Sequence, residues 1–174
     1  MADVHYLDTR GECKTQPTFT EVVVEGIAPG GGLFVPESLP HFTEEEILAL
    51  AQLPYAQRAA TIYKAFGVDL NDEIVDELMA KAYGDTFDDE AICPITTLNA
   101  STHVLELWHG PTSAFKDMAL QCLPLFFSAS AAQLQEQGKL DHNFLILVAT
   151  SGDTGKAALE GFCDVDGVSI AVMY

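Results

Sequence analysis

The sequence is poor in positive charge. It holds 8 Lys and Arg against 26 Asp and Glu, which gives a formal net charge of −18 at pH 7. A surface this acidic repels the phosphate backbone of nucleic acids and anionic lipid headgroups, so we expect neither nucleic acid nor a membrane as a partner. An anionic substrate has to be bound locally, against this field, by amide groups, helix N-termini and a few cations.

Cysteine motifs and long apolar runs are also absent. The four cysteines are far apart, with no Cys-x-x-Cys pair and no His at ligand spacing. They predict neither a metal site nor a dense disulfide framework, and isolated thiols are typical of a reducing compartment. The first residues lack the features of a signal peptide, and no apolar run reaches transmembrane length. We therefore expect a cytoplasmic protein.

The composition is otherwise that of a globular protein. Of the 174 residues, 48% are hydrophobic, which is enough for a sizeable core in one or two domains. Helix start and stop signals dominate the first hundred residues, whereas strand-like and helix-like runs alternate afterwards. We therefore expect an α/β protein, with a mainly helical amino-terminal domain over residues 1–100 and the first portion of a parallel-sheet domain over residues 101–174.

Three helices are predicted in the amino-terminal part. Thr43 and Glu46 have the capping-box spacing of a helix start. Pro54 fits the opening of a second helix, and Asn71 can cap a third that ends before Gly84. Residues 19–26 fit a strand or a helix, because short apolar runs do not distinguish the two. Residues 33–36 are expected to be extended, after a glycine-rich turn.

Strand and helix patterns alternate in the second part. Strands are predicted at 104–108, 144–149 and 168–174, and helices at about 115–137 and 156–163. Residues 144–149 are apolar on both faces, as in a buried parallel strand. The alternation predicts right-handed crossovers in a parallel sheet. Because open doubly wound sheets usually have more than three strands, we expect the chain to be the front portion of a longer protein.

Two loops follow predicted strands and lead into predicted helices. In parallel sheets such loops lie at the carboxyl ends of the strands, where ligands bind. The first loop leads to Lys116, and partial burial near a helix N-terminus favours the neutral amine that attacks a carbonyl. Lys116 also fits an ordinary surface lysine. Asp117 fits either a partner that orients the amine or a complement to the helix dipole.

The second loop, residues 150–155, is rich in hydroxyls and glycine. It fits an anion-binding cradle at a helix N-terminus, and equally a capped turn in which Asp153 or Thr154 is the N-cap. The charge of Asp153 suits a hydroxyl or a protonated heteroatom better than a phosphate. In the first loop, His109 fits substrate binding, proton transfer or a structural role beside a turn.

Together these motifs resemble the amino-terminal part of threonine synthase, a fold-type-II pyridoxal 5'-phosphate (PLP) enzyme. Four stretches carry the resemblance, in the family's order: 6–11, 26–36, 109–117 and 149–155. The third stretch is the family's lysine signature. The resemblance implies PLP as the cofactor and a carbon–oxygen lyase reaction of threonine biosynthesis. In that reaction O-phospho-L-homoserine and water yield L-threonine and phosphate.

The resemblance also implies roles for single residues. Lys116 would be the Schiff-base lysine and the general base and acid. Asp153 would face the ring hydroxyl of the cofactor. Three residues would contact the substrate carboxylate: Ser151, Gly152 and Thr154. In this family the loop that binds the cofactor phosphate and the residue that faces the pyridine nitrogen lie beyond Tyr174, so we expect the chain alone to be inactive.

Two other functions fit the sequence. One is a threonine-synthase-like phospho-lyase that acts on small phosphorylated hydroxy amino acids, or a dehydratase of the same fold. The other is a truncated, non-catalytic interaction module, for which the end of the chain at Tyr174 is the supporting feature. If the protein is an enzyme, few cations are available here for a doubly anionic substrate, and we expect residues beyond this segment to supply Arg or Lys to the phosphate pocket.

Overall fold

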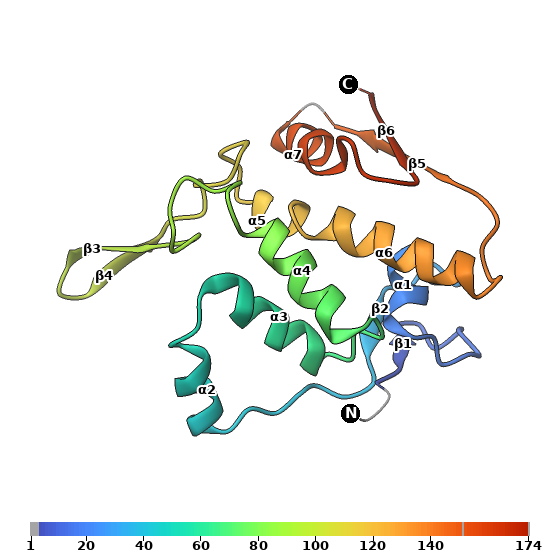
Figure 1. The fold of residues 1–174 in the computed structure, drawn as a ribbon, viewed down its shortest axis with the longest axis horizontal. Helices are drawn as coiled ribbons and strands as arrows, with labels where there is room; N and C mark the ends of the chain where they lie inside the picture. The colour runs from blue at the N-terminus through green and yellow to red at the C-terminus, as the bar shows by residue number, and fades with distance from the viewer. Residues whose placement is uncertain (1–3, 151, 174) are drawn as a thin grey trace. The chain divides into compact units, whose positions relative to one another are not determined.

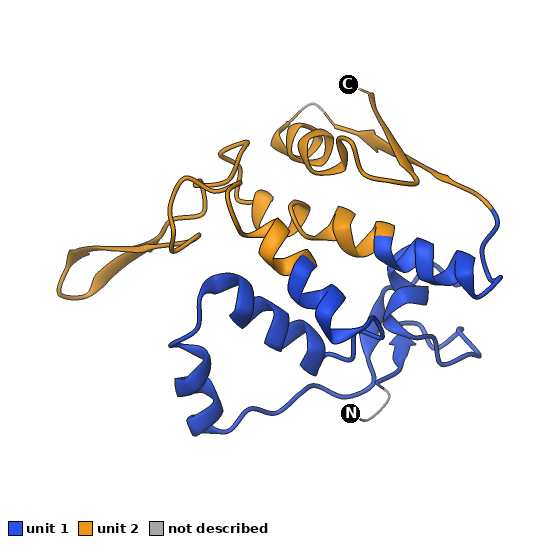
Figure 2. Ribbon diagram, in the orientation of Figure 1, with its two compact units in different colours: residues 1–77, 129–141 blue, residues 78–128, 142–174 orange. Residues whose placement is uncertain are grey.

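The structure is a computed structural model that describes residues 4–150 and 152–173. The chain divides into two compact units, which Figure 2 shows in two colours. One unit comprises residues 1–77 and 129–141, and the other comprises residues 78–128 and 142–174. The division into domains after residue 100 stays a prediction. No helix within the described ranges is both long enough and apolar enough to cross a membrane.

The predicted amino-terminal helices are all present (Figure 1). They are α2 (Glu44–Leu50), α3 (Tyr55–Ala65) and α4 (Asp72–Ala82), of which α4 continues into the second unit. At the start of α2, the Thr43 hydroxyl accepts a hydrogen bond from the Glu46 amide at 3.3 Å, and Glu46 Oε2 accepts one from the Thr43 amide at 2.7 Å. The capping box therefore forms as the spacing predicts.

The ambiguous segment near residue 20 is a helix, α1 (Phe19–Glu25). Its start is fixed by Glu21, which accepts a hydrogen bond from the Thr18 amide at 3.1 Å. Asp69 binds both the amide and the hydroxyl of the buried Thr20, at 2.8 and 2.9 Å. The Thr-x-x-Glu spacing at Thr18 is a capping-box signal that favours the helix over the strand.

The first unit also holds a small antiparallel sheet. Strand β1 (Tyr6–Asp8) pairs with β2 (Phe34–Pro36). The extended conformation predicted for residues 33–36 is therefore confirmed over the strand. The side chain of Asp8 is buried and accepts hydrogen bonds from the amides of Arg10 and Cys13, which folds the turn after β1.

The second unit contains the parallel strands. Strands β5 (Phe144–Ala149) and β6 (Val168–Met173) pair in parallel, with α7 (Asp153–Phe162) as the crossover between them. This confirms the predicted strand, helix and strand. In the described chain, however, one face of β5 is open, because Leu145 and Leu147 are 64% and 58% exposed.

The strand predicted at 104–108 does not belong to the parallel sheet. Strand β4 (Thr102–Leu105) pairs antiparallel with β3 (Ile95–Asn99) in a hairpin that extends from its unit (Figure 1). The two strands are joined by a short turn in which Asn99 Oδ1 accepts a hydrogen bond from the Ser101 amide at 3.0 Å. Such a short connection allows antiparallel pairing only, because parallel neighbours need a crossover of a dozen or more residues.

The long helix predicted over 115–137 is two helices, α5 (Asp117–Leu120) and α6 (Leu123–Glu136). Pro124 has no amide hydrogen for the Leu120 carbonyl, so the helical hydrogen-bond pattern breaks there. The Leu120 carbonyl oxygen lies instead against Gly161 of α7, where an added Cβ would be 2.0 Å away. The missing side chain of Gly161 thus lets α5 pack against α7.

Candidate functional site

Lys116 occupies the N-cap position of α5, with a helical backbone. Its carbonyl accepts hydrogen bonds from the amides of Ala119 and Leu120, at 3.0 and 2.8 Å. The side-chain amine lies 4.7 Å from the centroid of the exposed Phe115 ring. Among residues 4–150 and 152–173, no carboxylate forms an ion pair with Lys116 Nζ. The structure therefore presents a half-buried lysine whose amine forms no ion pair with an acid of the described chain.

Asp117, the next residue, closes the loop in front of α5. Its side chain is 0% exposed, and its carboxylate accepts hydrogen bonds from the Thr112 amide at 2.8 Å and the Thr112 hydroxyl at 2.7 Å. Gly110 packs so closely that an added Cβ would be 2.5 Å from Asp117 Cβ. Asp117 therefore folds the segment that carries Lys116, and it forms no hydrogen bond to the lysine amine within the described chain.

We expect Asp117→Ala to lower the free energy of unfolding of the protein by about 1–3 kcal/mol, because it leaves buried donors of Thr112 without an acceptor. Asp117→Asn keeps an oxygen acceptor of the same shape and should cost less. Urea unfolding measures both changes, with Glu90→Ala at an exposed site as the control. An Asp117→Ala protein as stable as the Glu90→Ala protein would contradict this role.

His109 lies between two carboxylates. Its Nδ1 is 2.6 Å from Asp88 Oδ1, and its Nε2 is 2.7 Å from Glu106 Oε2. The hydrogen bonds to Glu106 and Asp88 raise the pKa of the His109 ring above its ordinary value. The hydrogen bonds that Glu106 forms with Thr96 and His109 lower the pKa of its carboxyl below the ordinary value. Both ring nitrogens are occupied, so the predicted substrate contact of His109 would require one of these bonds to break.

The second predicted loop connects β5 to α7. Gly152 is the N-cap residue of α7, so neither Asp153 nor Thr154 holds the N-cap position considered for them. The Gly152 amide donates a hydrogen bond to the Thr150 hydroxyl at 3.3 Å. Asp153 is exposed and Thr154 is half-buried in the first turn of the helix, whereas Ser151 lies outside the described residues.

Lys156 joins the two loops. Its Nζ donates a hydrogen bond to the Thr112 carbonyl at 3.1 Å, so the segment that begins α7 is tied to the segment that precedes Lys116. Close packing at the start of α7 depends on Gly155, where an added Cβ would be 2.8 Å from Thr150 Cγ2. The two predicted loops therefore lie together within one unit.

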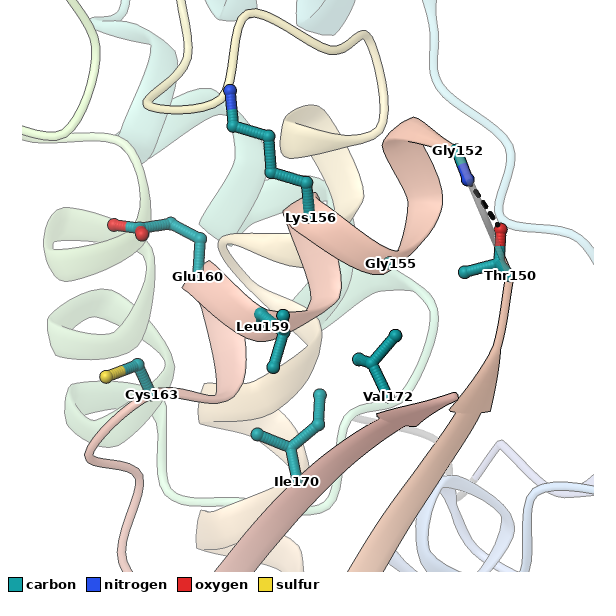
Figure 3. Close-up of a pocket in the computed structure, with 9 residues that line it drawn as sticks. All are labelled: Thr150, Gly152, Gly155, Lys156, Leu159, Glu160, Cys163, Ile170 and Val172. Carbon is teal, nitrogen blue, oxygen red and sulfur yellow. Dashed lines mark hydrogen bonds between the residues drawn. The ribbon is translucent and has the colours of Figure 1, made fainter. Parts of the chain in front are cut away.

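A pocket of about 670 Å³ opens beside α7 (Figure 3). Its polar end is formed by the start of the helix, and its apolar side by Leu159, Ile170 and Val172. The remaining lining residues are Thr150, Gly152, Gly155, Lys156, Glu160 and Cys163. The Lys156 side chain points away from these apolar residues, and its Nζ bonds to the Thr112 carbonyl (Figure 3). Lys116 is not among the residues that line the pocket. Of the predicted substrate-binding residues, Gly152 lines this pocket.

The partners that hold the first loop were not predicted from the sequence. Thr112 lies within the lysine motif, but its bond to Asp117 depends on a turn that motif spacing alone does not define. Glu106 stands three residues before His109, which is a weak local signal. Asp88 is 21 residues from His109, and an acidic run such as 88–90 is usually solvated, so the sequence offers no signal for that contact.

Comparison with known proteins identifies similar sequences. Residues 5–83 match the family described as threonine synthase N terminus. Threonine synthase from Pseudomonas aeruginosa is 40% identical over 172 residues, which cover 98% of this chain and 35% of the relative. Human threonine synthase-like 1 is 38% identical over 147 residues, which cover 83% of this chain and 19% of that protein.

A solved structure shows the same fold. The chain matches PLP-bound threonine synthase from Brucella melitensis with a TM-score of 0.87 and 37% identity, over 97% of this chain and 35% of that structure. The chain thus spans about a third of the length of these two threonine synthases. On this sequence and structural similarity, the chain matches the amino-terminal part of threonine synthases over nearly all of its own length.

Proposed function

We propose that the protein, at the full length of its relatives, is a threonine synthase. It would be a PLP-dependent carbon–oxygen lyase that converts O-phospho-L-homoserine and water to L-threonine and phosphate. The observation that carries this proposal is Lys116, which stands in the family's lysine motif with an amine that no carboxylate of the described chain neutralises.

The residues present fit one part of a PLP site. Lys116 offers the amine that would hold the cofactor covalently, and Asp153, exposed at the start of α7, would face the ring hydroxyl. The relative from Brucella melitensis binds this cofactor. When bound, PLP supplies an electron sink for negative charge that develops on the substrate carbons.

The chain's own residues would then bind substrate and move protons. Once its amine is free, Lys116 would remove and return protons at carbons of the substrate, as general base and acid. Gly152 and Thr154, together with Ser151, would bind the substrate carboxylate at the N-terminus of α7. The amides of the first helical turn and the positive end of the helix dipole favour an anion at that place. We further propose that Arg or Lys residues outside this segment bind the substrate phosphate.

Product analysis with O-phospho-L-homoserine tests the reaction. The full-length protein with PLP should release L-threonine and phosphate in equal amounts. The likeness to human threonine synthase-like 1 keeps a related phospho-lyase as the second candidate. That enzyme, or a dehydratase, would yield a keto acid in place of threonine. A protein that holds PLP and forms no product from this substrate would favour the non-catalytic interaction module.

We also propose that the protein is cytosolic. The four cysteines are far apart in the sequence and form no Cys-x-x-Cys pair. Cysteines spaced in this way fit a reducing compartment. Fractionation of the cells that produce the protein would test this location.

A further inference from the structure

His109 contacts Asp88, which is 21 residues away in the sequence, and Glu106, which is three residues before it. It forms two bonds with Asp88, since its ring contacts the Asp88 carboxylate at 2.6 Å and its carbonyl accepts from the Asp88 amide at 3.0 Å. Its other ring nitrogen contacts Glu106, whose second oxygen accepts a hydrogen bond from the Thr96 hydroxyl at 2.5 Å. The Glu106 amide also donates to the Pro94 carbonyl at 2.9 Å. His109 therefore forms hydrogen bonds to Glu106, directly after the β3–β4 hairpin, and to Asp88, in the loop that precedes it.

The segment after His109 leads directly to the lysine. Gly110 packs on the buried Asp117, and the Gly110 carbonyl accepts a hydrogen bond from the Ser113 amide at 3.0 Å. Asp117 holds Thr112 through two further hydrogen bonds. A displacement of His109 would thus shift Gly110, then Asp117 and then Lys116, because Gly110 packs on Asp117 and Asp117 directly follows Lys116 in the chain. Gly110 and Asp117 have little room to move apart independently, since a Cβ added at Gly110 would be 2.5 Å from Asp117 Cβ.

We propose that His109, clamped between Glu106 and Asp88, is a positioning residue that fixes the loop carrying Lys116, and that it does so without contacting substrate. This inference rests on the proposed function in one respect: the proposed function makes Lys116 the catalytic residue whose position matters. Hydrogen bonds between charged partners are about twice as strong as neutral ones, so the clamp depends on a protonated ring. The Trp108 ring also stacks on the His109 imidazole, with 5.6 Å between the two ring centroids.

The clamp has a defined pH range. Glu106 and Asp88 face the ring directly, and Asp89 adds negative charge nearby; these groups raise the pKa of His109. A raised pKa in the folded protein means that the contribution is complete below the unfolded pKa and is lost as pH rises through the folded one. At the acid end it is lost as pH falls through the lowered pKa of Glu106. The loop should therefore be most ordered between these two limits.

Three substitutions test the clamp in the full-length protein: His109→Gln, Glu106→Gln and Asp88→Asn. Hydrogen exchange of the Thr112 amide, which Asp117 holds, reports the order of the loop without any turnover. We expect His109→Gln and Glu106→Gln to speed this exchange by about tenfold, a loss equivalent to one hydrogen bond to a charged group. His103→Gln, on the exposed hairpin, and Glu90→Gln are matched controls that should leave the exchange unchanged.

Kinetics separate positioning from substrate binding. Misplacement of a catalytic group lowers kcat by up to about 100-fold, so we expect all three substitutions to lower kcat while KM stays within about twofold. The acidic partners should reproduce the effect of the histidine, although they would not touch substrate. A higher KM for His109→Gln alone, with Glu106→Gln and Asp88→Asn unchanged, would overturn the proposal and assign His109 to substrate.

The pH dependence gives a signature that a merely structural residue would not. After correction for intrinsic exchange, the Thr112 amide of the wild type should lose protection as pH rises through the His109 pKa. Glu106→Gln should move that loss to lower pH. Exchange that does not respond to this titration would refute the clamp. These readings do not depend on the reaction: failure of Lys116 to bind PLP, with the exchange results intact, would reject the proposed function and keep the clamp.

Discussion

Lys116→Ala should abolish threonine formation by the full-length protein, with a loss of kcat of at least about 1,000-fold. The substitution removes both the amine that would hold the cofactor and the group that would move protons, and residues that act in covalent chemistry have effects of this size. The structure supports this role through the position of Lys116 at the start of α5 and through the absence of an acidic partner in the described chain. Steady-state assays of released phosphate and threonine measure the loss.

Two controls separate chemistry from charge. Lys116→Arg keeps the positive charge but not an amine that can be freed of its proton, so it should be as inactive as Lys116→Ala. Lys81→Ala, at an exposed position of α4, should retain wild-type activity. A Lys116→Ala protein that still bound PLP in a borohydride-reducible form would show that another lysine carries the cofactor.

Gly161→Ala should lower the free energy of unfolding by about 2–3 kcal/mol. Alanine normally stabilises a helix interior by about 1 kcal/mol relative to glycine. At this place its Cβ would be 2.0 Å from the Leu120 carbonyl oxygen and 3.3 Å from Pro124 Cγ. The first of these contacts is with backbone, which cannot rotate away, so α7 would have to move from α5. Overpacking of this kind typically costs about 1–3 kcal/mol, occasionally more.

Chemical denaturation of the full-length protein measures this effect, with Glu160→Ala as the control. Glu160 lies next to Gly161 on α7 and is exposed, so its replacement adds no steric conflict. We expect its unfolding midpoint to remain close to that of the wild type. If Gly161→Ala were as stable as Glu160→Ala, the contact between α5 and α7 would be looser than the structure shows.

The helices of the first unit could be predicted because their signals are local. Thr43 with Glu46, and Asn71 with the Glu73 amide, form capping contacts within one turn of the chain. The α7 crossover between β5 and β6 follows in the same way from alternating patterns. The break between α5 and α6 has a local signal as well, because Pro124 interrupts the helical hydrogen bonds and so favours two helices over one long helix.

Contacts between distant residues could not be predicted. Residues 104–108 have a strand-like pattern, but the strand that forms is 102–105, and its antiparallel pairing with residues 95–99 could not be predicted because composition does not specify a partner. The same limit applies to the candidate site. The motif identifies Lys116, but the two bonds between His109 and Asp88 depend on the path of the intervening hairpin.

Borohydride reduction of the full-length protein with PLP, followed by peptide mapping, tests the central claim most directly. The reductant makes the bond between the cofactor and its lysine permanent, so the modified residue can be located by mass spectrometry. We expect the pyridoxyl group on Lys116, in the peptide that contains residues 109–117. A pyridoxyl group on Lys156 or on any other lysine, with Lys116 unmodified, would contradict the claim.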